Sequence, residues 1–545
     1  MPTEVAFEVI GLILVVAVVR AAARRVGLPE PVLLLLVGIG LAYVPGFPTY
    51  RLPPELMLQV VLPLLLYAAA FTAWLPALRA NARPIALMAV GYTLFTTVVV
   101  GYLAHLVIPG LPLAAGMVLG ALVAPPDAVA AVAVAREVGM PRRVVTILEG
   151  ESLFNDAAAL TALKVAVAAV VGESFGVVDA VGRFVLASAG GLVVGCCVAW
   201  LLAKVRARIE NPMSDATLSL LAPFLAYLPA NAIGASGLVS VVVTGLYLGH
   251  QAPRLTGAQS RVVAQSLWQV IEYVLVGVVF VLIGLRLPEI VAGLNSYSTG
   301  FLAFASVAVV AAVVISRFVW VFPAAYLPPL LLRRVRERDP APPWQLPALV
   351  SWAGMRGVVS LAAALSLPTT TATGAPFPQR ELLLFLTFVV IVATLLGQGL
   401  ALPAVVRRIR PPPDDDTAHT VQEAIAQRAV AAAGLQRLDE ILERENPPPE
   451  VVQQLREQAE RRLALAGAGG TCPDTEPVAV AYRRLRRQML DAARARLIEL
   501  RDRGELDQDA FLHVLRELDL EDASLVHDDR GQRVTRGTRT ARSQR

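Results

Sequence analysis

The stretch LEGESLFNDAAALTALKV, residues 148–165, places four ionisable side chains in a segment that otherwise has the composition of an apolar helix. They are Glu149, Glu151, Asp156 and Lys164. A charge at the centre of a bilayer costs about 2.5–3.5 kcal/mol on insertion scales, so charges in membrane helices face a water-filled cavity or a partner and mark functional sites. The first question is therefore whether this segment crosses a membrane.

Composition favours a membrane protein with a charged tail. The chain has 545 residues, of which 56% are hydrophobic, and its mean hydropathy is +0.61. Soluble domains rarely carry so much apolar content over such a length. Residues 1–410 contain 27 basic and 18 acidic residues, a net charge of +9, whereas residues 411–545 contain 21 and 25, a net charge of −4. We therefore predict a transmembrane region over 1–410 and a cytoplasmic, mainly helical tail over 411–527, followed by a disordered end over 528–545.

Several classes of function are disfavoured. The isoelectric point near 9.3 does not indicate nucleic-acid binding, because the basic residues fall mostly at predicted helix ends. The three cysteines, Cys196, Cys197 and Cys472, lack the spacing of metal ligands. The chain contains no Walker loop, no HExxH and no nucleotide-binding signature. We expect neither an enzyme nor a bound cofactor.

A bilayer requires about 20 mostly apolar residues per helix, and about thirteen such segments occur. The acidic start MPTEVAFEV does not resemble a cleaved signal peptide, so the first segment is interpreted as a retained membrane helix. The predicted spans lie near 5–23, 30–47, 55–76, 84–108, 112–135, 144–171, 181–203, 213–230, 234–249, 262–286, 299–328, 345–367 and 382–406.

Loop charge supports this helix count and sets an orientation. The loops after odd-numbered spans carry 20 Lys and Arg residues, and those after even-numbered spans carry 4. Cytoplasmic loops are enriched in Lys and Arg, so the alternation predicts an outside N-terminus and a cytoplasmic C-terminus in the cell membrane.

The first candidate site is on the opening segment. Ser152 and Asp156 are four residues apart, on one face of a helix, and Asn155 adjoins them. A carboxylate, a hydroxyl and an amide oxygen form a shell of hard ligands that suits an alkali cation. The carboxylate also binds a proton, and a group that holds one ion or the other is a basis for exchange. The alternative is an Asp satisfied by hydrogen bonds at a helix end.

The second candidate site is VAPPDAVAAV, residues 123–132. Two prolines in mid-span break the backbone ladder, and Asp127 follows directly. Transporters use broken helices to expose backbone carbonyls to cations. A simple proline kink, with Asp127 capping the half-helix, is the alternative.

The third candidate site is SWAGMRGVVSLAAALSLP, residues 351–368, where Gly354 and Gly357 flank Arg356. A buried Arg needs a carboxylate partner. Glu151 is the expected partner of Arg356, with Glu149 as the alternative. The break and this glycine-flanked segment occupy corresponding positions in two halves of opposite orientation, which predicts inverted repeats around a substrate site.

Three further charges remain inside predicted spans. Glu272 and Arg317 form a structural ion pair with each other, or each pairs elsewhere. Lys164 lies about 12 Å beyond Asp156 along a helix. It either tunes the local field or extends to the membrane surface, and we favour the second interpretation.

Taken together and in this order, these motifs resemble the bacterial sodium/proton exchangers of the monovalent cation:proton antiporter family. The resemblance covers residues 5–408 and implies thirteen helices, two crossed interrupted helices, a homodimer and an elevator-like alternating-access motion. By position, Asp156 is similar to the ion-binding and proton-exchanging carboxylate, with Asn155 completing an Asn-Asp pair typical of the electroneutral branch. Asp127 is similar to the acidic residue at the crossing, Ser152 to a ligand hydroxyl, and Glu151 with Arg356 to a structural ion pair.

The sequence departs from the family pattern in two places. The crossing has Pro126-Asp127-Ala128 where many members have Thr-Asp-Pro, so the Pro126 carbonyl is expected to replace the threonine. The third span has Ala68 where some members have a glutamate, so one ligand is missing or replaced by water.

We therefore predict a secondary antiporter that exchanges Na⁺, Li⁺ or K⁺ for H⁺ with 1:1 stoichiometry. The expected Na⁺ ligands are Asp156, Asp127 and Ser152. The partners are the two ions, the lipid bilayer and a second copy of the chain. A cation channel and a membrane-embedded sensor are the rival interpretations. Proton coupling distinguishes the exchanger from the channel, and ion flux distinguishes it from the sensor.

Overall fold

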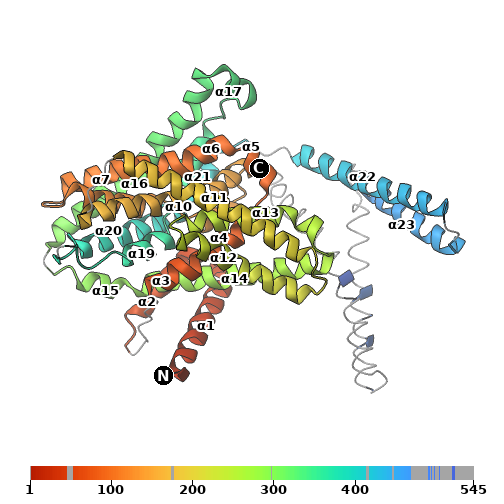
Figure 1. Ribbon diagram of the computed structural model, residues 1–545, viewed down its shortest axis with the longest axis horizontal. Coiled ribbons are helices and arrows are strands. Elements are labelled where there is room, and N and C mark those ends of the chain that lie inside the picture. Colours follow the sequence, from red (N-terminus) through yellow and green to blue (C-terminus); the bar gives the residue numbers. More distant parts are fainter. Residues whose placement is uncertain are drawn as a thin grey trace, which may run out of the picture. The chain divides into compact units, whose positions relative to one another are not determined.

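Helices make up nearly all of the regular structure in the computed structural model (Figure 1). Within the described residues the only β-pairing is an isolated bridge between Thr370 and Pro376. The chain divides into two units, Met1–Pro412 and Pro413–Arg545. The structure describes residues 2–26, 28–45, 53–172, 177–295, 297–372, 374–412, 416–444 and 447–467, with isolated positions between 489 and 521.

The first unit has the helices of a membrane protein, which confirms the predicted fold class. Among the described residues, six helices are long and apolar enough to cross a bilayer, and four shorter helices are also apolar. The total of thirteen spans stays a prediction, because several predicted spans are divided into shorter helices. The six are Ala82–Val107, Arg142–Val171, Val181–Arg206, Ala258–Ala292, Thr299–Leu331 and Arg380–Ile409.

Helix α10 (Arg142–Val171) contains the opening segment and contacts helices on two sides. One side is a set of helices that we call the core group (Figure 1). Two of its spans contain π-helical turns and two are interrupted. Its members, besides α10, are α6 (Ala82–Ala86), η2 (Leu87–Tyr92), α7 (Thr93–Val107), α8 (Leu113–Val123), α9 (Ala128–Glu137), α16 (Thr299–Leu331), α17 (Arg333–Arg338), α18 (Gln345–Trp352), α19 (Val358–Leu365), α20 (Arg380–Ala393), η3 (Thr394–Gly399) and α21 (Leu400–Ile409).

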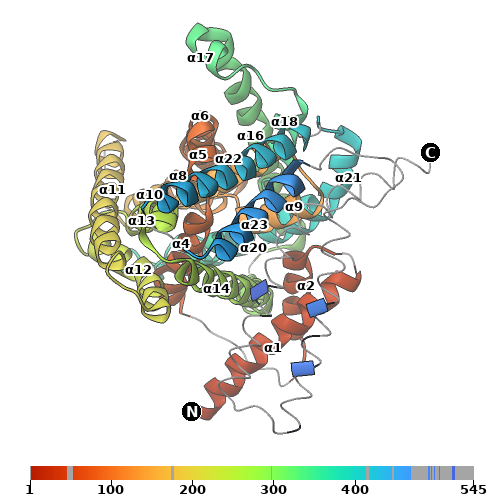
Figure 2. The ribbon, with the colours of Figure 1, turned by 90° about the vertical axis from the view of Figure 1, so that its right-hand side faces the viewer.

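The remaining helices of this unit form a second set, the flanking group. Within it α11 packs on α13, α13 on α4, and α14 on α2, and Figure 2 shows α11, α12 and α13 side by side. Its members are α1 (Pro2–Val26), α2 (Glu30–Ala42), α3 (Pro54–Leu56), η1 (Met57–Val61), α4 (Leu62–Thr72), α11 (Val177–Arg206), α12 (Pro212–Ala232), α13 (Gly237–Leu255) and α14 (Ala258–Leu285); the short helices α5 (Leu75–Ala80) and α15 (Leu287–Ala292) connect the two groups in sequence.

Small residues fix α8 against α7. A Cβ on Gly116 would lie 2.3 Å from the Gly101 carbonyl oxygen, and one on Gly120 would lie 2.1 Å from that of Thr97. Only glycine permits this backbone approach, which membrane helices use in place of a hydrophobic driving force. The C-terminal end of α8, where the first candidate break begins, is thereby held in place.

The second unit contains α22 (Asp416–Leu442) and α23 (Pro449–Gly467), which lie within the tail predicted to be mainly helical over 411–527. The rest of that tail, from 468 to 527, lies largely outside the described residues, and the predicted disordered end, 528–545, lies wholly outside them.

Candidate cation site at two crossed helix breaks

The first interruption separates α8 from α9. Helix α8 ends at Val123, α9 begins at Ala128, and Pro125 and Pro126 lie between them. Proline has no backbone N–H to continue the helical ladder, so these residues leave carbonyl oxygens of α8 free to bind other groups. The interruption predicted from the two prolines is confirmed.

The second interruption separates α18 from α19, at residues 353–357. Its glycines are required by close contacts. A Cβ on Gly357 would lie 1.7 Å from the Asp127 Oδ2 atom, and one on Gly354 would lie 2.4 Å from the Arg317 Cδ atom. The glycine-flanked sequence therefore permits a carboxylate from one break and a guanidinium from α16 to approach the other break.

Backbone hydrogen bonds join the two breaks. The Asp127 N–H donates to the Met355 carbonyl oxygen over 2.7 Å. The Arg356 Nε donates to the Val123 oxygen over 2.9 Å, and its other nitrogens donate to the carbonyl oxygens of Ala124 and Gly354. Arg356 thus places a positive charge at the C-terminal end of α8, where the helix dipole is negative.

The predicted pairing of Glu151 with Arg356 is wrong. Glu151 instead accepts two hydrogen bonds of 2.7 Å from Arg317, and both side chains are 1% exposed. Arg317 also donates to the Val350 carbonyl oxygen over 3.0 Å. The forked guanidinium of Arg317 faces the carboxylate edge-on and satisfies both of its oxygens, whereas backbone oxygens satisfy Arg356.

The other proposed partners also change. Of the two alternatives predicted for Arg317, a pair with Glu272 or a pair elsewhere, the structure has the second, because Arg317 pairs with Glu151. Glu149 is half-buried and is not among the described partners of Arg356. Glu272 is half-buried in α14, which belongs to the flanking group.

Tyr92 is a site residue that the sequence interpretation missed. It is the last residue of η2 and is fully buried. Its hydroxyl accepts a hydrogen bond from Arg356, and its ring centroid lies 4.9 Å from the Arg317 guanidinium carbon and 5.8 Å from that of Arg356. The ring face and hydroxyl bind two permanent cations at once. A tyrosine in mid-span was the available signal, since a buried hydroxyl needs a partner.

Asn155 connects α10 to the first break. Its Nδ2 donates to the Pro126 carbonyl oxygen over 2.9 Å, and the residue is fully buried. Its Oδ1 is buried and has no hydrogen-bond partner among the described residues. A buried oxygen without a donor is unusual, and it can accept a hydrogen bond or bind a cation.

Asp156 is 5% exposed, and no described residue donates a hydrogen bond to its carboxylate. The negative charge of Asp127 acts on it across the crossing. Ser152 lies one turn earlier on α10 and is half-buried. Among the described residues, no three His, Cys, Asp or Glu side chains are grouped as a metal site, so a cation here would also need oxygens from amide, hydroxyl or backbone groups.

A cavity of about 690 Å³ approaches the site along the C-terminal half of α10. We call it the vestibule. Its wall includes Ala157, which adjoins Asp156, together with Leu160, Thr161 and Lys164. Helices α11 and α12 and the start of α13 complete the wall, so the vestibule lies between the core and flanking groups. Lys164 is exposed and lines this cavity, and the interpretation that it extends to the membrane surface stays a prediction.

Ala68 is fully buried in α4 and supplies no oxygen ligand, which leaves the predicted gap in the donor set.

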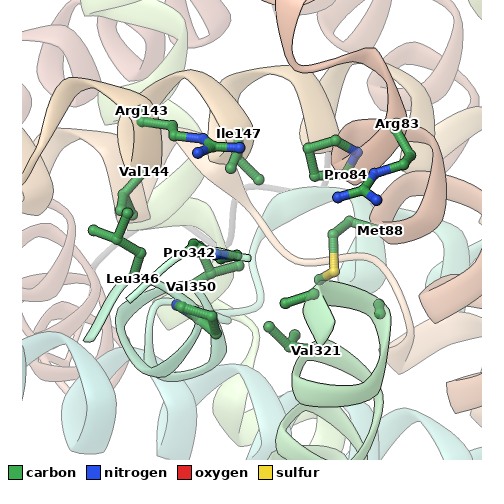
Figure 3. Close-up of a pocket in the computed structure, with 13 residues that line it drawn as sticks. Arg83, Pro84, Met88, Arg143, Val144, Ile147, Val321, Pro342, Leu346 and Val350 are labelled. Atoms are coloured by element: carbon green, nitrogen blue, oxygen red, sulfur yellow. The ribbon is translucent and has the colours of Figure 1, made fainter. Parts of the chain in front are cut away.

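The opposite end of α10 is braced by an ionic cluster. Asp339 accepts a hydrogen bond of 2.7 Å from Arg83 and one of 2.6 Å from Arg143. Below them is a pocket of only about 60 Å³ with mostly apolar walls, including Met88, Ile147 and Val350; Figure 3 shows both arginines beside it.

Two crossed broken helices, with buried carboxylates beside them and a cavity that reaches the residue next to Asp156, define a secondary transporter of the inverted-repeat type and not an enzyme. Comparison with known proteins gives the family. Residues 11–408 match the sodium/hydrogen exchanger transmembrane family, and the chain belongs to it.

Relatives extend over most of the chain. An uncharacterised Na⁺/H⁺ exchanger of Mycobacterium tuberculosis, Rv2287, is 34% identical over 95% of this chain and 97% of its own length. A sodium, potassium, lithium and rubidium/H⁺ antiporter of Bacillus subtilis is 32% identical over 73% of this chain and 61% of its own length. The solved sodium/proton antiporter MjNhaP1 of Methanocaldococcus jannaschii covers 73% of this chain and 100% of its own, with a TM-score of 0.57 and 18% identity, and shows the shared fold.

Proposed function

We propose that the chain exchanges a monovalent cation, Na⁺ or also Li⁺ or K⁺, for H⁺ across the cell membrane, with the two ions competing for Asp156. The observation that carries this proposal is the state of that carboxylate. It is buried, no described group donates to it, and its neighbour Ala157 lines the vestibule. A buried, unpaired carboxylate is costly, so it takes up a cation or a proton.

The surrounding oxygens suit an alkali cation. The orphaned Asn155 Oδ1 and the second lone pair of the Pro126 carbonyl are available near Asp156, and the carboxylate of Asp127 adds negative charge there. Ser152 adds a hydroxyl one turn away. Hard oxygen ligands of this kind bind hard cations. The relatives' names include sodium, potassium, lithium and rubidium, which supports keeping the choice of cation open.

A charge count supports electroneutral 1:1 exchange. Arg317 and Arg356 contribute two positive charges, and Glu151, Asp127 and Asp156 contribute three negative charges. The empty site therefore carries −1, and one monovalent cation or one proton neutralises it. Moving an unneutralised charge through apolar surroundings is penalised by desolvation. On this proposal the core group moves only when Asp156 is occupied, which couples the two ions.

The vestibule's position supports alternating access. It separates the core group from α11, α12 and α13, so relative motion of the two groups would close it. We further propose an outside N-terminus, a cytoplasmic C-terminus and a homodimer.

The test is Asp156→Asn in proteoliposomes with a pH-sensitive dye. This variant keeps the side chain's shape but not its charge, so cation-driven proton flux should fall at least a hundredfold while folding is retained. The matched control is Asp439→Asn, at an exposed carboxylate of α22. In the wild type, the half-saturating cation concentration should rise up to about tenfold per pH unit as the medium is acidified, because the ions compete. Wild-type-like flux from Asp156→Asn, or cation current without proton movement, would refute the assignment.

A further inference from the structure

The vestibule, which extends along α10 as far as Ala157, has basic but no acidic side chains among the described residues that line it. Lys164 and Arg183 are the basic residues. Such lining is unexpected in the path of a cation. Arg183 is engaged by another group, so the argument depends on Lys164.

Lys164 is exposed to the vestibule and has no ion pair with a described residue. It lies on α10 two turns beyond Asp156, about 12 Å away by helix geometry. The residues between them, Ala157, Leu160 and Thr161, also line the cavity, so a cation that approaches Asp156 along this cavity would pass the Lys164 ammonium.

We propose that Lys164 determines the affinity for cations on one face of the protein: its charge lowers the cation concentration in the vestibule and so weakens capture from that face. This inference rests on the proposed exchange at Asp156. A unit charge acting across about 8–12 Å of partly aqueous space changes the local concentration of a monovalent cation roughly two- to tenfold.

The consequence is a difference between the two faces of the membrane. A cation released from Asp156 enters a vestibule that Lys164 keeps poor in cations, so another cation rarely binds from that side, whereas capture of a cation from the other face does not involve the vestibule. With the proposed orientation the vestibule opens to the outside, so Lys164 favours release during cation extrusion. It changes half-saturation and not stoichiometry, because a fixed charge does no net work over a complete cycle.

The test measures half-saturating Na⁺ in right-side-out and in everted membrane vesicles. Lys164→Gln should lower this concentration about two- to fivefold in one vesicle orientation and leave it unchanged in the other. Lys164→Glu should lower it further in the same orientation, and Lys164→Arg should match the wild type. Adding about 0.5 M choline chloride should bring the ratio of the wild-type to the Lys164→Gln half-saturating concentration towards one, because salt screens exposed charges.

Lys204 provides a matched control. The chain has only two lysines, Lys164 and Lys204. Lys204 packs 3.7 Å from the Trp200 ring centroid near the end of α11 and does not line the vestibule. Lys204→Gln should leave the vestibule-side half-saturation unchanged.

The same scarcity allows a chemical test on otherwise unaltered protein. In a Lys204→Arg background, a membrane-impermeant acylating reagent that converts amines into neutral amides should reproduce the Lys164→Gln effect. A protein with arginine at both positions should not respond.

The outcomes separate the inference from the proposed function. No proton-coupled flux in the wild type overturns both. Normal wild-type flux with an unchanged Lys164→Gln half-saturation, or with equal changes in both orientations, overturns the inference alone, because a uniform change reports a disturbed site and not a one-sided field.

Discussion

The two ends of α10 differ in packing and in charge. At the N-terminal end, Asp339 binds Arg83 and Arg143 beside a pocket of about 60 Å³. At the C-terminal end, Lys164 lines a vestibule of about 690 Å³ and has no ion pair with a described residue. The N-terminal end of α10 is therefore closed by paired charges, whereas the C-terminal end is open and is lined by the unpaired charge of Lys164. The two carboxylates at the crossing lie between these ends, and of the two cavities only the vestibule reaches the residue next to Asp156.

The largest expected effect comes from removing the ion pair that separates Asp156 from the closed end. Arg317→Met leaves Glu151 buried without its partner, which costs about 3–5 kcal/mol of stability. The apparent melting temperature in detergent should fall strongly, and adding Glu151→Gln should recover part of the loss because the unpaired charge is removed.

The control for that prediction is Arg333→Met, which breaks an exposed pair with Glu337 whose side chains are 83% and 62% exposed. Such surface pairs contribute roughly 0–1 kcal/mol. Equal losses from Arg317→Met and Arg333→Met would contradict the assigned role of the buried pair.

A smaller effect should follow from filling the open end. Thr161→Trp adds a bulky ring to the vestibule wall while the cavity leaves room for it. Exchange should fall roughly tenfold, about 1.4 kcal/mol in a rate, with little change in melting temperature. The control is Val98→Trp on the exposed face of α7, where the side chain is 55% exposed. Undiminished flux in Thr161→Trp would mean that ions do not pass through the vestibule.

The smallest effect is expected at the closed end. Asp339→Ala leaves Arg83 and Arg143 without their shared carboxylate, but both are partly exposed and Arg143 retains its bond to Asn81. We expect a loss of about 1 kcal/mol, read as a small drop in melting temperature. Glu440→Ala, in an exposed pair with Arg437, is the control. If Asp339→Ala lowered the melting temperature as much as Arg317→Met does, the ionic cluster at the closed end would contribute more to stability than we propose.

Much of the site could be predicted because membrane burial makes polar residues conspicuous. Asp156, Asn155 and Asp127 stand in apolar segments, and paired prolines and glycines mark both interruptions. Sequence spacing also relates Ser152 to Asp156, because both lie on one helix.

Partners on different helices could not be assigned in the same way. The predicted partner of Glu151 is Arg356, but no spacing relates residues on different helices, and the packing of α16 brings Arg317 to Glu151 instead. The glycines of the second break carry the missing information, since Gly354 makes room for Arg317 and Gly357 for Asp127. The vestibule beside Lys164 could not be predicted, because it depends on how α11 and α12 pack near α10, which no local pattern encodes.

Arg356 gives the crossing a permanent occupant. Its guanidinium binds the carbonyl oxygens of Val123, Ala124 and Gly354. Without Arg356, these oxygens could form a second binding site for a transported cation. Because arginine stays protonated throughout the physiological pH range, the guanidinium keeps its charge and continues to occupy these oxygens. On the proposed mechanism, the protein therefore transports one cation at a time, whatever the salt concentration on either side of the membrane.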